Sequence, residues 1–438
     1  MQRAGCLSAI FEIVSQRYRL IRHVTIFYNF LSPQTSNIHH PTKNHYFCKM
    51  DIENLKIQIK TFFGLEQVLF EEIKKLGGSN VELKNRAVNC EGDLGFLYKI
   101  NYSARTALKI LVPIYEFKAF NQHQFYNKLS QFPWEDFMDV DQTFAIDSTV
   151  NSETFKHSQF VTLKMKDAIV DYFQEKVKKR PNIETRSPEI KFHLHIDREL
   201  VTISMDSSGD ALFKRGYRRE QGEAPINEVL ASGMLQLAGW DGKGNFLDPM
   251  CGSGTILIEA AMIALDLPAQ IFRKRFAFQN WNNYDDDLFT KIKEVRINRV
   301  REFTGKIVGY DVDGRMLNAA RTNIESAEME DIIDVRRQDF FESKKDLFPL
   351  LMVFNPPYDE RISINDDDFY KKIGDTFKSS YPNTLAWLIS SDLDAPKKIG
   401  LRPSRKIKLF NGKLETRFLQ YEMYEGTKKI HKLENREE

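Results

Sequence analysis

A glycine-rich turn in the second half of the chain has residue types suited to binding chemistry. In the segment FLDPMCGSGT, Asp248 and Pro249 precede Gly252 and Gly254. Glycines let a backbone approach a ligand closely, and a helix that starts here offers free N–H groups. The turn lacks the G-x-G-x-x-G of dinucleotide sites and the lysine of a P-loop. A carboxylate repels phosphate, so the turn favours a cationic or hydroxyl-bearing ligand. The alternative is a plain tight turn capped by the aspartate.

Two further acids end strand-like runs. Asp311 follows the run 307–310, at the place where an acid holds ribose hydroxyls in nucleotide-binding folds. Asp339 lies beside Phe340, and an acid next to an aromatic ring suits a purine through its amine and its face. Each acid alone is more often a turn or cap residue. In this order, the three acids and the glycine turn describe an adenosine without phosphate. S-adenosylmethionine, which carries a sulfonium, is such a ligand.

The segment Asn355-Pro356-Pro357-Tyr358 closes the apolar run 350–354. Two prolines stiffen the backbone and remove two N–H donors, so the carbonyl groups remain as acceptors. The exocyclic amine of a base matches the Asn355 oxygen and the Pro356 carbonyl, and Tyr358 can stack on the base. A sulfonium already activates its methyl group, so positioning suffices and no strong base is required. The alternative is a rigid turn that only ends a strand.

These residues need strands and helices that bring them to one edge of a sheet. Strands are expected at 246–247, 307–310 and 350–354, with helices at 255–265 and around 317–324. This alternation predicts an open α/β sheet, which binds ligands outside the carboxyl ends of its strands. Asp311 comes much later than the usual spacing of about 20 residues after a glycine turn. We attribute the excess to an inserted segment, 266–300.

The region before the sheet has a different character. Residues 51–210 alternate short strands with amphipathic helices and predict one or two α+β modules without a nucleotide loop. The polar segment 207–225 is interpreted as a linker. His193 and His195 share a strand face, but no third ligand is evident, so we expect no metal site.

Basic residues near aromatic ones are candidates for contacts with an RNA backbone. One group flanks Tyr217 in the linker, and the other lies between Phe272 and Phe276 in the inserted segment. They are Lys214, Arg215, Arg218, Arg219, Arg273, Lys274 and Arg275. A solvated linker is an equally good interpretation of the first group.

Composition narrows the class of protein. The chain has 438 residues, 42% hydrophobic and 28% charged, as in ordinary globular proteins. No apolar run approaches the roughly 18 residues of a membrane span. Its four cysteines show no CxxC spacing, which fits a reducing cytoplasm. The net charge is +2, so nucleic-acid binding would require a local basic face.

The first 49 residues contain six Lys or Arg and one acid. They could form a transit peptide. We favour a leader without a role in the fold, either unstructured or untranslated with Met50 as the start.

The motifs FLDPMCGSGT and NPPYDERI resemble those of class I S-adenosylmethionine-dependent methyltransferases that act on base amino groups. The linker KRGYRREQGEAPINEVLA is similar to one branch, the THUMP-containing RNA methyltransferases. Within it, the chain is most similar to the enzymes for guanine N2 of bacterial 23S ribosomal RNA, whose relatives are also named N6-adenine-specific DNA methylases. The resemblance covers about 51–425 and includes the inserted segment.

The resemblance implies a Rossmann-like methyltransferase domain preceded by α+β ferredoxin-like and THUMP modules. The expected boundaries are a leader (1–49), a ferredoxin-like region (51–110), a THUMP RNA-binding domain (111–206), a linker (207–225), a methyltransferase domain (226–425) and a polar tail (426–438). By resemblance, the cofactor residues are Asp248, Pro249, Gly252, Gly254, Asp311, Asp339, Phe340 and Asn355. The target-base residues are Asn355, Pro356, Pro357 and Tyr358.

The resemblance implies methyl transfer to an exocyclic amine of RNA, at guanine N2 of large-subunit ribosomal RNA, in the cytoplasm. Two alternatives remain open. One is an N6-adenine methyltransferase acting on DNA or RNA, and the other is a non-catalytic RNA-binding ribosome-assembly factor. The bacterial enzymes can be fused to a second methyltransferase, which modifies a guanine at N7. That second activity is not expected within this chain.

Overall fold

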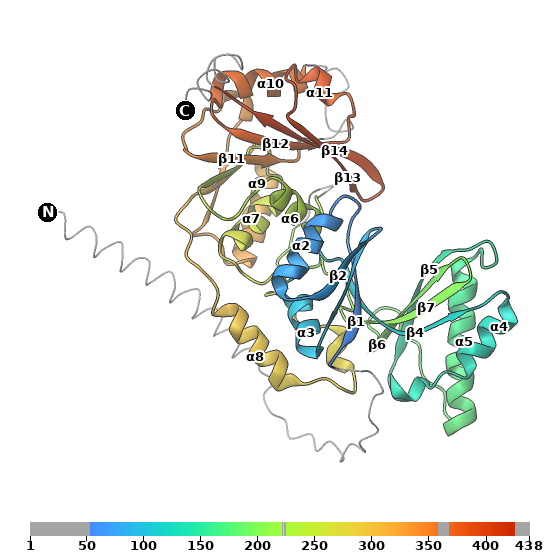
Figure 1. The fold of residues 1–438 in the computed structure, drawn as a ribbon. Coiled ribbons are helices and arrows are strands. Elements are labelled where there is room, and N and C mark those ends of the chain that lie inside the picture. The colour runs from blue at the N-terminus through green and yellow to red at the C-terminus, as the bar shows by residue number, and fades with distance from the viewer. Residues whose placement is uncertain (1–52, 221, 223–224, 358–367, 425–438) are drawn as a thin grey trace.

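The computed structural model describes residues 53–220, 222, 225–357 and 368–424. The expected leader and polar tail, and Tyr358 of the target-base segment, lie outside these ranges. The described part consists of two seven-stranded sheets with helices packed against them (Figure 1). Within it, no helix is long and apolar enough to cross a membrane.

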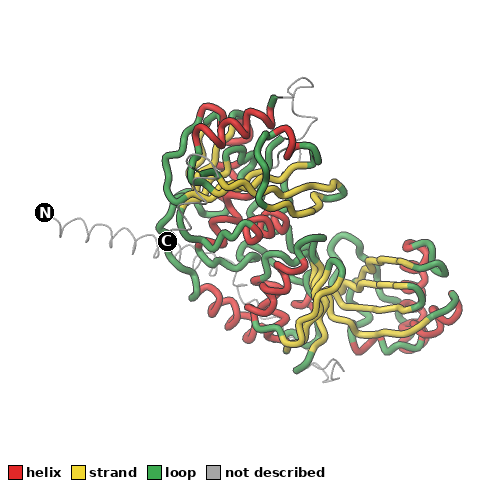
Figure 2. Tube along the Cα trace, turned by 45° about the horizontal axis from the view of Figure 1, so that its top comes forward, coloured by secondary structure: helices red, strands yellow, loops and turns green. Residues whose placement is uncertain are grey.

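The first sheet runs through both expected N-terminal modules. Its strands, in spatial order, are β2 (Ser79–Lys84), β3 (Ala87–Gly92), β1 (Leu55–Lys60), β4 (Lys109–Lys118), β7 (Leu200–Asp206), β6 (Ile190–Asp197) and β5 (Phe144–Asn151). The helices of this half are α2 (Glu66–Leu76), α3 (Leu94–Ser103), α4 (Gln122–Ser130) and α5 (Ser158–Val177), with a 3-10 turn η1 (Trp134–Asp136). The strands pass continuously from one lobe into the next (Figure 2).

Strand β4 joins the two modules because it is long enough to pair with both. Its first residues pair with β1, where Gln58 lies opposite Leu111. From Leu111 onward it pairs with β7, starting opposite Asp206. A single ten-residue strand therefore carries hydrogen bonds on one side to the ferredoxin-like part and on the other to the THUMP part. The prediction of α+β modules is confirmed, and the continuous sheet is an additional finding.

The second sheet is mostly parallel. Its strands, in spatial order, are β10 (Ile333–Arg337), β9 (Ile307–Asp311), β8 (Asn245–Asp248), β11 (Leu350–Phe354), β12 (Leu385–Ser390), β14 (Leu414–Glu422) and β13 (Arg405–Asn411). The helices are α6 (Glu228–Leu237), α7 (Thr255–Ala264), α8 (Asp286–Ile297), α9 (Gly314–Ser326), α10 (Phe369–Ser380) and α11 (Ala395–Lys398), with 3-10 turns η2 (Ala277–Asn280) and η3 (Phe340–Glu342). Among the described strands of this sheet, β14 alone runs in the direction opposite to the others.

Both faces of the parallel sheet are covered, which explains why its strands are apolar without alternation. Along β11, Val353 belongs to one hydrophobic core and Met352 and Phe354 to the other. The fully apolar strand 350–354 was predicted from the sequence, and its bounds are confirmed.

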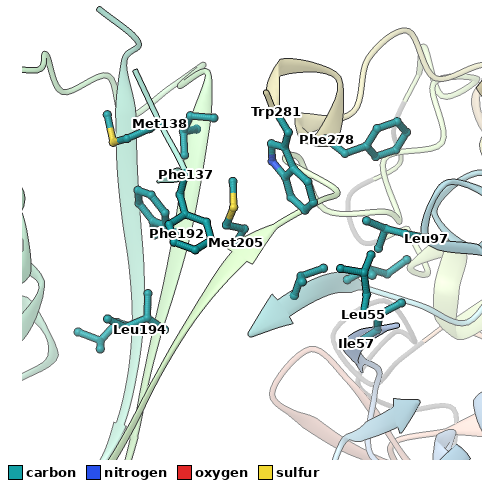
Figure 3. Packing of buried hydrophobic residues seen from close by; sticks show 14 of the residues in the cluster. Leu55, Ile57, Leu97, Phe137, Met138, Phe192, Leu194, Met205, Phe278 and Trp281 are labelled. Carbon is teal, nitrogen blue, oxygen red and sulfur yellow. The ribbon is translucent and has the colours of Figure 1, made fainter. Parts of the chain in front are cut away.

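The inserted segment 266–300 joins the two halves. Phe276, Phe278, Trp281 and Phe289 are buried in the core cluster of the N-terminal half (Figure 3). Tyr98 of α3 stacks on Phe278 with ring centroids 4.5 Å apart. A side chain of the N-terminal half is in turn buried in the C-terminal half. Leu65, just before α2, is fully buried in a core of that half. The insertion therefore fixes the N-terminal half against the second sheet.

Candidate active site

The order of the second sheet creates a crevice at the carboxyl ends of β8 and β11. Strand β8 has β9 on one side and β11 on the other, so successive connections leave in opposite directions. This is the switch point where open α/β sheets bind ligands. A cavity of about 820 Å³ opens there, which we call the strand-end cavity. It is lined by the turn 248–253, by 311–316, by 338–341 and by 355–357, with Phe369 of α10.

The glycine turn has the geometry that only glycine adopts easily. Gly252 and Gly254 have φ angles of 52° and 82°, in the left-handed region. A Cβ on Gly252 would meet nothing within 4 Å, so that position is open toward the strand-end cavity. Helix α7 starts directly after Gly254 without a side-chain cap, so its first N–H groups remain available to a ligand. Cys251 is buried.

Two carboxylates face each other without a basic partner. Asp248 is 1% exposed, and its Oδ1 accepts a hydrogen bond from the Met250 N–H at 3.1 Å. Asp311 accepts from the Gly252 and Asp313 N–H groups, each at 2.9 Å. Burial raises the pKa of Asp248 well above its usual range, and the nearby Asp311 adds to the increase. Burial also raises the pKa of Asp311, although its two backbone donors oppose this.

The acids around the strand-end cavity outnumber the bases. Four aspartates line it, and Arg315 is the basic residue among the described lining residues. Arg315 pairs with Asp313 at 3.1 Å and leaves Asp248 and Asp311 uncompensated. Such a cavity stabilises a cationic ligand.

The turn after β10 presents an acid and an aromatic ring. The Oδ1 of Asp339 accepts from the Phe341 N–H at 2.9 Å, so the carboxylate caps η3 and still borders the strand-end cavity. The ring of Phe340 is only 2% exposed and packs in the core with Phe354. The half-buried Phe341 packs edge-on against Phe369 at 5.6 Å and gives the cavity a second aromatic wall. Phe369 was not expected from the sequence as a site residue.

Asn355 lies at the end of β11 with an acceptor available. Its Oδ1 is buried and has no hydrogen-bond partner among the described residues. Asn355, the buried Pro356 and Pro357 all line the strand-end cavity together with Asp248 and Pro249. The structure therefore brings the glycine turn and the Asn-Pro-Pro corner to the same cavity. A buried unpaired oxygen is costly, so it marks a place for a donor.

The predictions that Arg215 and Arg218 contact RNA are wrong. Arg215 is 1% exposed, and its guanidinium donates to Glu259 and to the Leu212 and Arg105 carbonyls. Arg218 pairs with Glu228 at 2.8 Å and donates to the Thr255 hydroxyl. Both side chains make hydrogen bonds and ion pairs with partners inside the fold. The sequence offered one signal for this, because Glu259 is the single acid within the apolar helix α7 and needs a buried base.

The other five basic candidates come together. Lys214, Arg219, Arg273, Lys274 and Arg275 line a second cavity of about 830 Å³, between the THUMP half and the second sheet. We call it the basic cavity. Arg186 and Lys191 also line it, and sequence reasoning missed them because they lie in the loop before β6 and in that strand, far along the chain from the others. No group of three His, Cys, Asp or Glu in the described ranges could hold a metal.

The order of the second sheet, its antiparallel β14 and the acid-lined glycine turn at the switch point have a known counterpart. They are the features of a class I methyltransferase fold, the S-adenosylmethionine-dependent type.

Family models match consecutive parts of the chain. They are the RlmL ferredoxin-like domain at 56–111, the THUMP domain at 120–206 and the RMKL-like methyltransferase domain at 215–420. The chain belongs to this family of THUMP-domain methyltransferases.

Curated relatives support the assignment. The "Ribosomal RNA large subunit methyltransferase K/L" of Cellvibrio japonicus is 34% identical over 373 residues, which are 82% of this chain and 50% of that protein. A Synechocystis protein, slr0064, named as a candidate RNA methyltransferase, is 32% identical over 364 residues, 82% of this chain and 95% of its own. The chain thus spans about half the length of the K/L relatives and nearly all of the Synechocystis protein.

Solved structures show the same arrangement. SMU.472, described as a candidate methyltransferase complexed with SAH, has a TM-score of 0.77 at 27% identity, over 86% of this chain and 100% of its own. A Listeria monocytogenes protein described as a predicted N6-adenine-specific DNA methylase has a TM-score of 0.77 at 28% identity, over 87% and 99%.

Proposed function

We propose that this chain transfers a methyl group from S-adenosylmethionine to an exocyclic amine of a base in RNA, at guanine N2 of large-subunit ribosomal RNA. One observation carries the proposal. Two uncompensated carboxylates and an unpaired Asn355 oxygen line the same strand-end cavity. The two carboxylates suit a cationic nucleoside, and the Asn355 oxygen suits a base amine.

The cofactor follows from charge. S-adenosylmethionine supplies a methyl group on a positive sulfur and also carries an ammonium group. Burial raises the pKa values of Asp248 and Asp311, and neither carboxylate has a basic partner. A cationic ligand would therefore favour their ionised forms. Asp311 is also placed to accept ribose hydroxyls, and Asp339 with Phe341 borders the region suited to adenine. The relative SMU.472 is described with the demethylated product, SAH.

The target amine would be held by acceptors. Asn355 Oδ1 and the Pro356 carbonyl accept its two N–H groups, which turns the nitrogen lone pair toward the methyl donor. Phe369 borders the same cavity, and an aromatic face stabilises an unstacked base by about 1–3 kcal/mol. Transfer forms an N–C bond as the S–C bond breaks, and the extra proton on nitrogen leaves to solvent. This arrangement positions the amine and does not require a strong base.

RNA as the substrate is supported by the THUMP domain, the names of the large-subunit relatives and the basic cavity. The second candidate is adenine N6, in DNA or RNA. The description of the Listeria structure favours it, and the same acceptors fit that amine. A non-catalytic assembly factor would have no use for two buried, uncompensated carboxylates.

The test uses tritium transfer from labelled cofactor to unmodified large-subunit ribosomal RNA, followed by nuclease digestion and identification of the methylated nucleoside. We expect N2-methylguanosine from the wild-type chain. Asn355→Ala should reduce kcat by about 100-fold, because one positioned acceptor is lost. Asn298→Ala, at the exposed end of α8, is the matched control. An unchanged rate in Asn355→Ala would refute the amine-holding role, and N6-methyladenosine as the product would establish the second candidate.

A further inference from the structure

The basic cavity has a lining that is strongly and asymmetrically charged. Seven basic residues border it: Arg186, Lys191, Lys214, Arg219, Arg273, Lys274 and Arg275. Two acids, Glu189 and Asp210, also border it. Both acids are engaged, because Glu189 accepts from Thr143 and Asp210 pairs with Lys214 at 3.2 Å. An excess of fixed positive charge in a concave site attracts a polyanion.

Ser326 of α9 borders this cavity, and three longer segments build the rest of it. They are the entry to β6 in the THUMP half (186–191), the linker (208–219) and the inserted segment (272–280). The cavity therefore exists only when the two halves are packed together. The same linker continues to Gly222, Pro225 and Ile226, which line the strand-end cavity. A ligand held in the basic cavity is thus one short segment away from the proposed target-base corner.

The cations differ in how much hydrogen-bonding capacity they retain. Arg273 donates to the carbonyls of Ser208, Asp210, Ala211 and Arg275, so its guanidinium is held by the backbone. Burial lowers the pKa of Arg273 to about 10, which still leaves it charged at neutral pH. The Arg186 and Lys274 side chains make no hydrogen bond or ion pair with any described residue. They come from different segments, Arg186 from the THUMP half and Lys274 from the insertion.

We propose that the basic cavity binds the phosphodiester backbone of the RNA substrate, with Arg186 and Lys274 as direct phosphate contacts and Arg273 as a fixed positive charge that ties the linker to the insertion. The proposal rests on the proposed function and adds the surface that positions the RNA. The THUMP half and the methyltransferase half then bind the same RNA molecule. The site is expected to contact the RNA backbone and not the base edges, because its free hydrogen-bond donors are charged groups suited to phosphate.

The test measures binding of an unmodified ribosomal RNA fragment by fluorescence anisotropy over a range of salt concentrations. The double variant Arg186→Glu with Lys274→Glu should bind roughly tenfold or more weakly, and its slope of log affinity against log salt should fall by about 2. Lys306→Glu is the control, a charge reversal at an exposed residue just before β9 that lines neither cavity. SAH affinity, measured by calorimetry, should be unchanged in all three proteins.

Several outcomes would overturn the proposal. One is a double variant that keeps the wild-type salt slope, or that loses no more affinity than the Lys306 control. Another is displacement of the RNA by micromolar tripolyphosphate, which would make the cavity a site for a small polyphosphate. Failure of the proposed function looks different. If the wild-type chain binds RNA with the full salt slope but transfers no methyl group, the proposed methyltransferase activity is refuted. The proposed RNA binding in the basic cavity is then still supported.

Discussion

The strand-end cavity and the basic cavity have almost the same volume, about 820 and about 830 Å³, and opposite charge. Four aspartates border the first, and seven Lys or Arg border the second. One linker contributes to the walls of both. The contrast indicates two ligands that differ in charge, a phosphate-free cation at the strand ends and a phosphate polymer beside it. The near-neutral net charge of the chain conceals this division.

The linker, which forms part of the wall of both cavities, is anchored by a buried ion pair. Arg215 and Glu259 are fully buried, and Arg105 donates to the carbonyls of Met262 and Leu267 from the N-terminal half. Tyr217 and Ser232 also donate to Glu259. The basic segment of the linker is thus divided. Some of its arginines build the wall, and the others face the basic cavity.

The largest expected effect comes from breaking that wall. Glu259→Ala leaves the Arg215 charge buried and unpaired, which should lower the free energy of unfolding by about 3–5 kcal/mol. Because the linker borders both cavities, affinity for SAH and for RNA should fall together. Chemical denaturation and calorimetry measure the two effects.

Two variants sharpen this result. Replacing both partners, Arg215→Met with Glu259→Met, should restore much of the lost stability, since no charge is left unpaired. Glu294→Ala, on the exposed face of α8, serves as a surface control. If Glu259→Ala weakens only one ligand, the shared-wall interpretation is wrong.

The sequence predicted the strand-end cavity far better than the basic one. Asp248 and Asp311 end strands, Asn355 directly follows one, and Gly252 lies in the turn after β8. Local pattern and the rule of parallel sheets therefore place them at one edge. Their types are also unusual for such positions, which makes the pattern specific.

The basic cavity could not be predicted in the same way. Most of its residues come from three segments that meet only through tertiary packing, so Arg186 was missed. Arg215 and Lys214 are adjacent in the sequence, yet one is buried and the other exposed. Only the position of Glu259 in the fold decides between them. The short strands β2 and β3 were also missed, because β2 is largely exposed and lacks an apolar pattern.

The second prediction uses pH to separate the cavities. Asp248 and Asp311 have raised pKa values in the free protein, so both tend to hold protons that a cationic cofactor would displace. Cofactor binding should release on the order of one proton, and affinity should rise with pH through the raised pKa range. RNA binding should lack this rise, because Lys and Arg make the proposed contacts in the basic cavity and neither of these two carboxylates lines it. Calorimetry in two buffers of different ionisation enthalpy measures the released protons.

Asp248→Asn tests the source of that proton. SAH, which keeps the ammonium group, should bind about 10- to 100-fold more weakly, and proton release should fall. A carboxyl group whose pKa is higher in the folded state than in the unfolded state stabilises the fold at pH values below its unfolded pKa. This stabilisation is lost as the pH rises through the folded pKa, so ionised Asp248 lowers the stability at neutral pH. The ligand-free variant should therefore melt at or above the wild-type Tm. Asp331→Asn, exposed before β10, is the control. Unchanged proton release in Asp248→Asn would remove the basis for the charge comparison.

The smallest expected effect concerns Asn323, which connects the two cavities. Its side chain is 1% exposed and accepts hydrogen bonds from the Arg219 and Glu220 N–H groups. It also donates to the carbonyls of Glu220 and Ser253, the latter in the glycine turn. Asn323→Ala should lower the free energy of unfolding by about 1–3 kcal/mol, because buried backbone groups lose their partners.

The binding effects of Asn323→Ala should be modest and shared. Both the glycine turn and the Arg219 segment lose an anchor, so SAH and RNA should each bind several-fold more weakly. The salt slope of RNA binding should stay at the wild-type value, because no phosphate contact is removed. Asn318→Ala, exposed on the same helix α9, controls for helix propensity. If only SAH affinity falls, Asn323 supports the glycine turn alone, and the two cavities are held by separate anchors.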